Sequence, residues 1–458
     1  MSAAPWRRAL VVGMGKSGRS VVRLLDALGV AVVAYDRSPP ADLPAGVTSY
    51  SGETIPPEAY AGIDLMVLSP GVPPGPARAL AAQHAPEAAI HGELGLALAL
   101  IHSGVRDEWS PLPTVLITGT NGKSTVTAML GAILEADGRR PFIGGNLGTP
   151  LCDVLTDALP AGGTWPGALV VECSSYQLET LPSVPTRVAM VLNVTPDHLD
   201  RYTSMAHYAE TKGRIFAGLG ESDLALLLAD DDWTARLRPR HARVRLIGDA
   251  AGPHVEGEGE GTRLHVADGE SMPRAAVRLP GRHNAVNAVF AVCAARHLGV
   301  SLASCEAALQ AFQGLPHRMV HVRDLDGVAY YNDSKATNVA SALASLGGLD
   351  RRFVLIAGGK AKGDDLAPLS RLVAARAVGL VTIGEAGPTF AALGRGTVAT
   401  SEAPSLTEAV TVARAMAKPG DAVVLAPACA SFDQFKSYAH RGEVFTSAVL
   451  ALAPESPV

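Results

Sequence analysis

Short apolar runs alternate with helix-compatible stretches along the whole chain. Near the N-terminus the apolar runs cover residues 9–12, 30–35 and 64–68, and a helix-compatible stretch that ends at about residue 28 separates the first two. A short apolar run bounded by turn residues is typical of a buried strand. Strands that alternate with helices predict a parallel sheet covered by helices.

The alternation continues toward the C-terminus, with one interruption rich in glycine and glutamate. Strands are predicted at residues 115–117, 168–171, 188–192, 224–229, 328–331, 353–356, 378–383 and 422–425, and a helix at 284–297. The interruption, residues 252–274, is interpreted as a loop or hairpin without chemistry of its own. The whole pattern predicts an α/β protein built from parallel, doubly wound sheets.

Length and composition breaks divide this pattern into domains. A chain of 458 residues is too long for one ordinary core, and about three domains are expected. A polar, proline-containing stretch at 103–113 is typical of a linker, and the helical pattern ends again near residue 314. We therefore predict domains at residues 1–107, 108–314 and 315–458.

Composition and charge exclude several classes of partner. The formal net charge is −5 and no cluster of lysine and arginine stands out, so a nucleic-acid-binding surface is not expected. The five cysteines lack metal-type spacing, which favours free thiols in a reducing compartment. The most apolar helical run, residues 94–101, is too short to cross a bilayer. These features predict a soluble, cytoplasmic protein that acts on small molecules.

A glycine-rich turn after the first strand of the middle segment carries the strongest chemical signal. It reads Gly119-Thr-Asn-Gly-Lys-Ser-Thr125, and a helix-compatible stretch follows. Backbone N–H groups in such a turn cradle phosphates, Lys123 neutralises the β and γ oxygens, and the Ser124 hydroxyl can ligate Mg²⁺. Residue 117 is Ile where the usual P-loop has glycine, so this is a shortened variant. The sequence predicts ATP binding here.

A second glycine turn lies near the N-terminus. Gly13, Gly15 and Gly18 follow the first strand, and Asp36 ends the second strand about twenty residues later. This pattern is the dinucleotide-binding fingerprint, and by itself it predicts a nicotinamide-dependent oxidoreductase. That chemistry, however, has no use for the P-loop further along the chain.

Acidic and imidazole side chains follow two later strands. Glu172 directly follows the predicted strand at 168–171, at a position where a Mg²⁺ ligand is expected beside a P-loop. His198 lies within Asn193-Val-Thr-Pro-Asp-His-Leu-Asp-Arg-Tyr202, which combines an imidazole, two carboxylates and a guanidinium. Several ionisable side chains in one short segment at a strand end favour a metal or substrate site over a structural histidine.

Further polar residues gather at a helix start and at one turn. Asn284 and Asn287 lie one turn apart on a predicted helix, where spacing alone favours helix capping over recognition of a purine. Asp333 could hold a ribose and Lys335 a phosphate. The alternative for these two is a capping box before the next helix.

Two loops of the last segment suggest a site for a carboxylate. The loop at 358–363 contains Lys360 and Lys362, and Ser431 is predicted to open a helix. A cation, a hydroxyl and free N–H groups together suit an anion. The alternative is an ordinary turn followed by an N-cap, a role that Ser431 can fill at the same time.

Taken together, these motifs resemble the Mur ligases, the ATP-dependent amide-forming enzymes of peptidoglycan assembly. The resemblance rests on the shortened P-loop, the segment 193–202, Glu-Cys-Ser-Ser-Tyr-Gln-Leu-Glu from residue 172, His-Asn-x-x-Asn from 283 and Leu-Pro-His-Arg from 315, and it runs through essentially the whole chain. Asn-Asp-Ser-Lys-Ala-Thr-Asn from residue 332 and Ala-Pro-Ala-Cys-Ala-Ser-Phe-Asp-Gln-Phe from 426 are similar to the branch that adds D-glutamate to UDP-N-acetylmuramoyl-L-alanine.

The resemblance implies a Rossmann-like N-terminal domain for the UDP moiety, a central P-loop domain for ATP and a Rossmann-like C-terminal domain for glutamate. ATP would be held by Gly119, Thr120, Asn121, Gly122, Lys123, Ser124, Thr125, Asn287, Arg318 and Asp333. The UDP-linked substrate would contact Gly15, Lys16, Ser17, Asp36, Arg37, Ser69, Pro70, Gly71, Asn146, Ser174, Gln177 and His198. Glutamate would contact Thr337, Lys362, Ser431 and Tyr438.

The resemblance also implies the catalytic groups. Two Mg²⁺ ions would be held by Ser124, Glu172, His198 and Lys212, with Lys212 carried as a carbamate, and the catalytic side chains would be Lys123, His198, Lys212 and Lys335. Lys212 lies in a helix-compatible stretch. Without the resemblance it would be interpreted as a surface ammonium.

The implied reaction joins glutamate to the UDP-linked substrate through an acyl phosphate and releases ADP and phosphate. A carboxylate is a poor acyl donor because its leaving group would be oxide, and phosphorylation removes that obstacle. The resemblance implies the D enantiomer of glutamate. L-Glutamate is the alternative, because both enantiomers carry the same charges. A nicotinamide oxidoreductase and a nucleotide-gated scaffold are the competing classes. The protein is expected to be a cytoplasmic monomer without nucleic-acid partners or membrane insertion.

Overall fold

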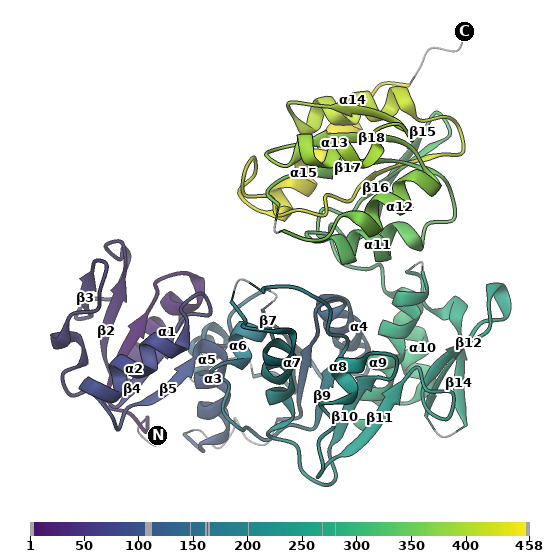
Figure 1. Ribbon diagram of the computed structural model, residues 1–458. Coiled ribbons are helices and arrows are strands. Elements are labelled where there is room, and N and C mark those ends of the chain that lie inside the picture. The colour runs from purple at the N-terminus through teal and green to yellow at the C-terminus, as the bar shows by residue number, and fades with distance from the viewer. Residues whose placement is uncertain are drawn as a thin grey trace. The chain divides into compact units, whose positions relative to one another are not determined.

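The computed structural model describes residues 4–105, 112–146, 148–160, 163, 165–199, 201–267, 269–279, 281–361 and 363–454. The chain divides into two compact units, the first comprising 1–276 and 286–311 and the second 277–285 and 312–458. Among the described residues, strands form four sheets with helices between them (Figure 1). The predicted α/β class is confirmed, and the limits at residues 107 and 314 stay predictions.

The N-terminal sheet is parallel throughout. Its strands, in spatial order, are β3 (Thr48–Ser51), β2 (Ala31–Asp36), β1 (Arg8–Val12), β4 (Leu65–Leu68) and β5 (Ala89–Gly92). Apolar side chains of α1 (Lys16–Ala27) and α3 (Glu93–His102) cover one face, and α2 (Pro74–His84) and η1 (Pro57–Tyr60) cover the other. The strand order reverses between β1 and β4, and ligands of open α/β sheets bind at such a point.

The central sheet is also parallel and positions the P-loop. Its strands, in spatial order, are β11 (Arg243–Ile247), β10 (Leu224–Leu228), β9 (Val188–Val191), β6 (Thr114–Thr118), β8 (Ala168–Glu172) and β7 (Pro141–Gly145). Because β9, β6 and β8 are neighbours, the segments that follow them meet at one edge of the sheet. These segments are the P-loop, Glu172 and the Asn193–Tyr202 turn.

Helices and short 3₁₀ turns lie between and after the strands of the first unit. Helix α4 (Lys123–Ala136) packs against β6, β7 and β8. The others are α5 (Leu151–Ala158), α6 (Ser175–Leu178), α7 (Met205–Gly213), η3 (Arg214–Phe216), α8 (Asp232–Ala235), η4 (Gly259–Gly261), η5 (Arg274–Ala276), α9 (Arg282–His297) and α10 (Leu302–Ala311). Helix α9 begins in the second unit and continues in the first.

The glycine- and glutamate-rich segment is more ordered than predicted. Strands β12 (His254–Glu256), β13 (Arg263–Ala267) and β14 (Glu270–Pro273) form an antiparallel sheet of three strands. The buried side chains of Val255, Leu264 and Met272 face each other across the register and form its apolar side. The strands have three to five residues each, which is too short for an alternating pattern to stand out in the sequence.

The C-terminal sheet is mixed, which corrects the prediction of parallel strands alone. Its order is β15 (Val320–Leu325), β16 (Val328–Asn332), β20 (Ala422–Leu425), β17 (Phe353–Gly358), β18 (Ala377–Ile383) and β19 (Ala399–Glu402). Strand β15, which was not predicted, is antiparallel to β16 because Asp326 and Gly327 form a two-residue hairpin turn with φ of 52° and 78°. Helices cover both faces, with α11 (Val339–Gly347), α12 (Ala367–Arg376) and α13 (Gly387–Gly394) on one and α14 (Leu406–Met416) and α15 (Tyr438–Ala451) on the other.

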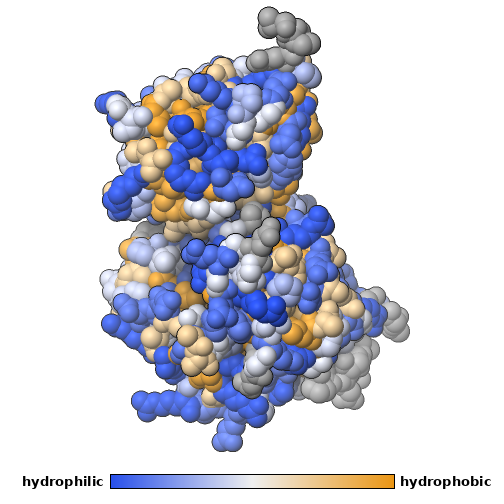
Figure 2. All heavy atoms as spheres, turned by 90° about the vertical axis from the view of Figure 1, so that its right-hand side faces the viewer, coloured by the Kyte–Doolittle hydropathy of each residue, from blue (hydrophilic) through white to orange (hydrophobic). Residues whose placement is uncertain are grey.

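Surface and interior agree with the composition. In the described parts of the chain, no helix is long and apolar enough to span a bilayer. Hydrophilic residues occupy much of the face in Figure 2, with smaller hydrophobic patches between them. The five cysteines are free, as predicted, and all of them are buried.

Candidate active site

The P-loop connects β6 to α4 and depends on two glycines. Gly119 and Gly122 have φ of 153° and 85°, a region that side chains rarely adopt. A Cβ atom at Gly122 would also lie 2.7 Å from Oδ1 of Asn287, which is buried. Helix α4 begins at Lys123, so the N–H groups of its first turn lie at this loop. The arrangement suits a bound anion.

Lys123 turns back onto the loop that precedes it. Its Nζ atom donates to the carbonyl oxygens of Gly119 and Thr120, at 2.8 Å each. These bonds hold the ammonium beside the turn where the sequence predicts the phosphates of ATP. The positive charge is therefore already positioned for an anionic ligand.

Asn193 fixes the shape of the P-loop, although it is not among the predicted site residues. Its Oδ1 accepts from the backbone N–H of Asn121 at 2.8 Å, and its Nδ2 donates to the Asn121 carbonyl at 3.1 Å. The backbone N–H of Thr120 donates to the Asn193 carbonyl at 2.9 Å. Its position just after β9, the strand that pairs with β6, could have indicated this role.

Glu172 carries a buried oxygen that lacks a partner. The residue is 2% exposed, and its Oε1 accepts from Asn146 Nδ2 at 2.8 Å, whereas Oε2 has no hydrogen-bond partner. A buried carboxylate oxygen without a partner is costly. Mg²⁺ prefers oxygen ligands, and Ser124, in the first turn of the helix that follows the neighbouring strand β6, is also buried. The donor set therefore fits the predicted Mg²⁺.

Lys212 is buried, which contradicts its interpretation as a surface lysine. It is 1% exposed, and its Nζ donates to the carbonyl oxygen of Gly119 at 3.0 Å. The Nζ also lies 4.5 Å from the centre of the Tyr208 ring. Burial, with a smaller contribution from Lys123, holds the pKa of the Lys212 amine well below its usual value. The neutral amine is thus more populated than on an ordinary lysine.

His198 is held in a fixed orientation. Its φ of 56° is unusual for a residue with a side chain. The Tyr176 hydroxyl lies 3.1 Å from Nδ1, and Nε2 lies 3.6 Å from Oδ2 of Asp197. Tyr176 is a positioning residue that the sequence reasoning did not single out. Contact of His198 with Mg²⁺ or substrate stays a prediction.

Side chains of the N-terminal domain brace its glycine turn. The Met14 N–H donates to Oδ2 of Asp36 at 2.5 Å, and the Ser69 hydroxyl donates to the Gly13 carbonyl at 2.7 Å. A Cβ at Gly18 would lie 1.8 Å from that carbonyl oxygen, so only glycine fits there. Asp36 and Ser69 therefore shape the turn, whatever ligand it binds. The other residues predicted here are Gly15, which caps α1, together with Ser17, Pro70 and the exposed Arg37.

Long basic side chains connect the first two sheets within the first unit. Lys16 Nζ donates to the Gly148 carbonyl at 2.7 Å. Arg201 pairs with Glu179 at 2.5 Å and also donates to the Gly71 carbonyl at 3.4 Å. These contacts tie the predicted UDP-binding loops to the segment that contains His198.

Ser174 and Gln177 cap helix α6. Gln177 N–H donates to the Ser174 hydroxyl at 3.3 Å, and Gln177 Oε1 accepts from the Ser174 N–H at 3.0 Å. This is a capping box, which satisfies two free N–H groups reciprocally. Their predicted contact with substrate stays a prediction.

In the second unit, Asp333 is buried beside a positive charge. Its Oδ1 accepts from the Met319 N–H at 3.1 Å, and its Oδ2 has no hydrogen-bond partner. Burial raises the pKa of Asp333 to about 7, and interactions with Ser345 and Arg318 oppose that rise. The unpaired oxygen fits a ligand hydroxyl or cation. The predicted capping role belongs instead to Asn338, which caps α11.

Arg441 organises the predicted glutamate-binding loops and was not predicted. It is fully buried, and burial lowers its pKa to about 10. Its guanidinium donates to the Ser334 hydroxyl at 3.0 Å and to the Cys429 carbonyl at 3.1 Å. The Ser334 hydroxyl in turn donates to the Tyr438 carbonyl at 2.8 Å. One side chain thus joins the segments that contain Thr337, Ser431 and Tyr438.

The local structure at Ser431 differs from the prediction. Ser431 is 2% exposed and lies in a turn closed by the Phe435 N–H, whereas the helix begins at Tyr438 with Ser437 as its N-cap. The Lys360 and Ala430 backbones pair at 2.9 and 3.0 Å, which joins this turn to the basic loop. Lys362 lies outside the described residues. Lys335 Nζ lies 3.9 Å from the centre of the Tyr438 ring.

A P-loop beside a strand-end carboxylate defines a nucleotide-dependent enzyme, and comparison with known proteins gives its family. Residues 117–295 match the Mur ligase middle domain, and residues 317–429 match the Mur ligase glutamate ligase domain. A UDP-N-acetylmuramoylalanine--D-glutamate ligase of Myxococcus xanthus is 42% identical over 97% of this chain and 98% of its own length. The ligase of the same name from Thiobacillus denitrificans is 40% identical, covering 98% and 97%. The chain belongs to the Mur ligase family.

Solved structures agree with this fold. The MurF ligase of Thermotoga maritima, in complex with ADP, superposes with a TM-score of 0.62 at 17% identity, covering 99% of this chain and 97% of its own. The UDP-N-acetylmuramate-alanine ligase MurC of the same organism gives a TM-score of 0.61 at 17% identity, covering 97% and 99%. The predicted α/β fold class, with Rossmann-like and P-loop domains, is confirmed.

Proposed function

We propose that this protein joins D-glutamate to UDP-N-acetylmuramoyl-L-alanine, with conversion of ATP to ADP and phosphate, in peptidoglycan precursor synthesis. The observation that carries the proposal is the buried lysine at the phosphate loop, Lys212, whose Nζ lies 3.0 Å from the Gly119 carbonyl. The names of relatives that match nearly the whole chain support the choice of substrates. The proposal places the reaction in the cytoplasm and in a monomer.

The chemistry requires two transfers. A carboxylate oxygen of the UDP-linked substrate attacks the γ-phosphorus of ATP, the bond to the β–γ bridging oxygen breaks, and ADP leaves. The amine of glutamate then attacks the acyl carbon and loses a proton, and phosphate departs with the former carboxylate oxygen. Positioning and charge neutralisation supply most of the catalysis in such phosphoryl transfers.

The chain's residues have separate tasks in this scheme. Lys123 offsets the phosphate charge, while Ser124 and Glu172 would hold Mg²⁺, which when bound neutralises charge on the transferred phosphoryl group. A neutral Lys212 amine would combine with CO₂ and release a proton, giving a carbamate. That anion would attract the second predicted Mg²⁺, together with His198, where an ammonium would repel it.

The proposed function predicts that ADP is released over repeated turnovers only when both other substrates are present. Without the amine acceptor the acyl phosphate cannot turn over, and without the UDP-linked substrate there is no carboxylate to phosphorylate. A coupled assay of ADP release, with each substrate omitted in turn, measures this. Equal ADP release after either omission would contradict the ligase assignment.

Glutamate recognition is proposed to rest on Thr337, Lys362 and Ser431, with Tyr438 beside them. Loss of a hydrogen bond to a charged group costs about 1.5–3 kcal/mol, so Lys362→Ala and Ser431→Ala should raise the KM for glutamate roughly ten- to a hundredfold. Lys360→Ala, in the same loop and exposed, is the matched control and should leave that KM unchanged. An unchanged glutamate KM in both test variants would place the pocket elsewhere.

A further inference from the structure

Three potential metal ligands share one face of the small antiparallel sheet. His254 on β12 lies directly opposite His265 on β13. Side chains two residues apart on a strand point to the same side, so Glu256 lies on the face that carries both imidazoles. The register alone therefore brings two imidazoles and a carboxylate together, and none of the three belongs to the predicted active site.

The ligand atoms are close to one another. One ring nitrogen from each histidine and one carboxylate oxygen of Glu256 all lie within 4.8 Å of each other. His265 Nε2 lies 2.7 Å from Glu256 Oε2, and the two imidazole rings stack with their centres 4.5 Å apart. Two imidazoles and a carboxylate are the donor set of several zinc sites.

Neighbouring groups orient these ligands. His254 Nδ1 lies 2.8 Å from the Gly252 carbonyl, so this nitrogen carries the hydrogen and the lone pair is on Nε2. A backbone carbonyl bound to the second nitrogen is the usual support for a metal-binding histidine. Arg263, directly opposite Glu256, donates to the Ser271 hydroxyl at 2.9 Å and the Ser271 carbonyl at 3.1 Å. The carboxylate of Glu256 is thus directed to His265.

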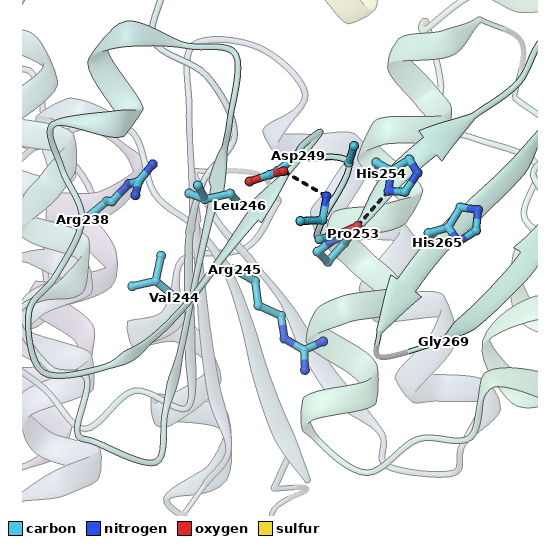
Figure 3. Close-up of a pocket in the computed structure, with 12 residues that line it drawn as sticks. Arg238, Val244, Arg245, Leu246, Asp249, Pro253, His254, His265 and Gly269 are labelled. Carbon is cyan, nitrogen blue, oxygen red and sulfur yellow. Dashed lines mark hydrogen bonds between the residues drawn. The ribbon is translucent and has the colours of Figure 1, made fainter.

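The two histidines also line a pocket of about 550 Å³. Figure 3 shows His254 and His265 side by side on neighbouring strands, with Arg238 on the opposite side of the pocket. The site is open to solvent, since the side chains of His265 and Glu256 are 31% and 65% exposed. A metal ion can therefore reach it without opening of the fold.

We propose that His254, Glu256 and His265 bind a divalent transition metal of the Zn²⁺ class. Imidazole nitrogen suits Zn²⁺ and Co²⁺, whereas Mg²⁺ prefers oxygen ligands, so this site differs in selectivity from the one predicted at Glu172. Tetrahedral ligands about 2.1 Å from Zn²⁺ lie about 3.4 Å apart, so metal binding requires the His265–Glu256 pair to separate and the more distant ligand atoms to approach, each by roughly 1 Å. The metal replaces the proton between His265 and Glu256 and leaves a fourth position for water.

Titration of the full-length, untagged protein with Co²⁺ and Zn²⁺ tests this proposal. Excess Mg²⁺ in the buffer occupies oxygen-only sites, and calorimetry and the visible spectrum of Co²⁺ report binding to imidazole. We expect one equivalent per chain, and at least tenfold weaker binding in His254→Ala, His265→Ala and Glu256→Gln. Zn²⁺ should also raise the Tm of the parent protein more than that of these variants.

Two exposed neighbours provide matched controls. His241→Ala and Glu258→Gln remove a histidine and a glutamate outside the cluster, and both should bind Co²⁺ like the parent protein. Glu256 is exposed and glutamine is nearly isosteric with it, so Glu256→Gln tests the site without loss of folding. Absence of Co²⁺ binding by the parent protein, or equal affinity in Glu256→Gln, would overturn the proposal. Neither result would affect the ligase assignment, which does not depend on these residues.

Discussion

Lys212→Ala should be folded yet nearly inactive, with kcat reduced on the order of a hundredfold or more, the scale of removing one preorganised electrostatic group. The low pKa of the buried amine favours the neutral form that reacts with CO₂. The variant would lose the proposed carbamate and its contribution to Mg²⁺ binding. Steady-state ADP release and circular dichroism measure activity and folding separately.

Chemical rescue separates this role from simple packing. Acetate should partly restore Lys212→Ala by occupying the vacated space, but it should not restore Lys212→Met, where the side chain fills that space. Lys418→Ala, at an exposed lysine, is the control and should keep full activity. Carbon-13 bicarbonate should give a carbamate signal in the parent enzyme. Full activity of Lys212→Ala without such a signal would contradict the assignment.

Lys123→Ala should abolish ADP formation while UDP-substrate binding survives. The ammonium contacts two carbonyl oxygens of the P-loop, so its removal takes away both the phosphate-neutralising charge and a constraint on the loop. The effect on kcat should be on the order of a thousandfold. Lys123→Arg should also be impaired, because a planar guanidinium does not replace a compact ammonium.

Calorimetry with the UDP-linked substrate provides the second readout for Lys123→Ala. We expect an unchanged dissociation constant, because the predicted UDP contacts lie in the N-terminal domain. Loss of UDP-substrate binding in the folded variant would show that the two sites are not separable.

Much of the central site could be predicted because strand ends and motifs coincide. Gly119, Lys123 and Glu172 follow neighbouring strands β6 and β8, and parallel strands bring such residues to one edge. The burial of Lys212 could not be deduced from its helix alone, since the surrounding sequence is polar and the packing against Gly119 is a tertiary contact. Its role came from the family resemblance.

Other parts were beyond local pattern. Arg441 is buried through contacts with Ser334, 107 residues away in sequence, and with Cys429, and arginine is ordinarily a surface residue. Asn193 contacts Asn121, 72 residues away in sequence, so a local pattern does not reveal this contact either. Strand β15 was missed because its polar residues hide the alternation, although the Asp326-Gly327 turn was a usable hairpin signal.

Transfer of labelled oxygen tests the central claim most directly. UDP-N-acetylmuramoyl-L-alanine with oxygen-18 in its carboxylate is incubated with ATP and either D- or L-glutamate, and the released phosphate is analysed by mass spectrometry. The proposed acyl phosphate predicts one labelled oxygen in each phosphate formed with D-glutamate, and phosphate at background with L-glutamate. Unlabelled phosphate would contradict the acyl phosphate, and equal turnover with L-glutamate would contradict the substrate assignment.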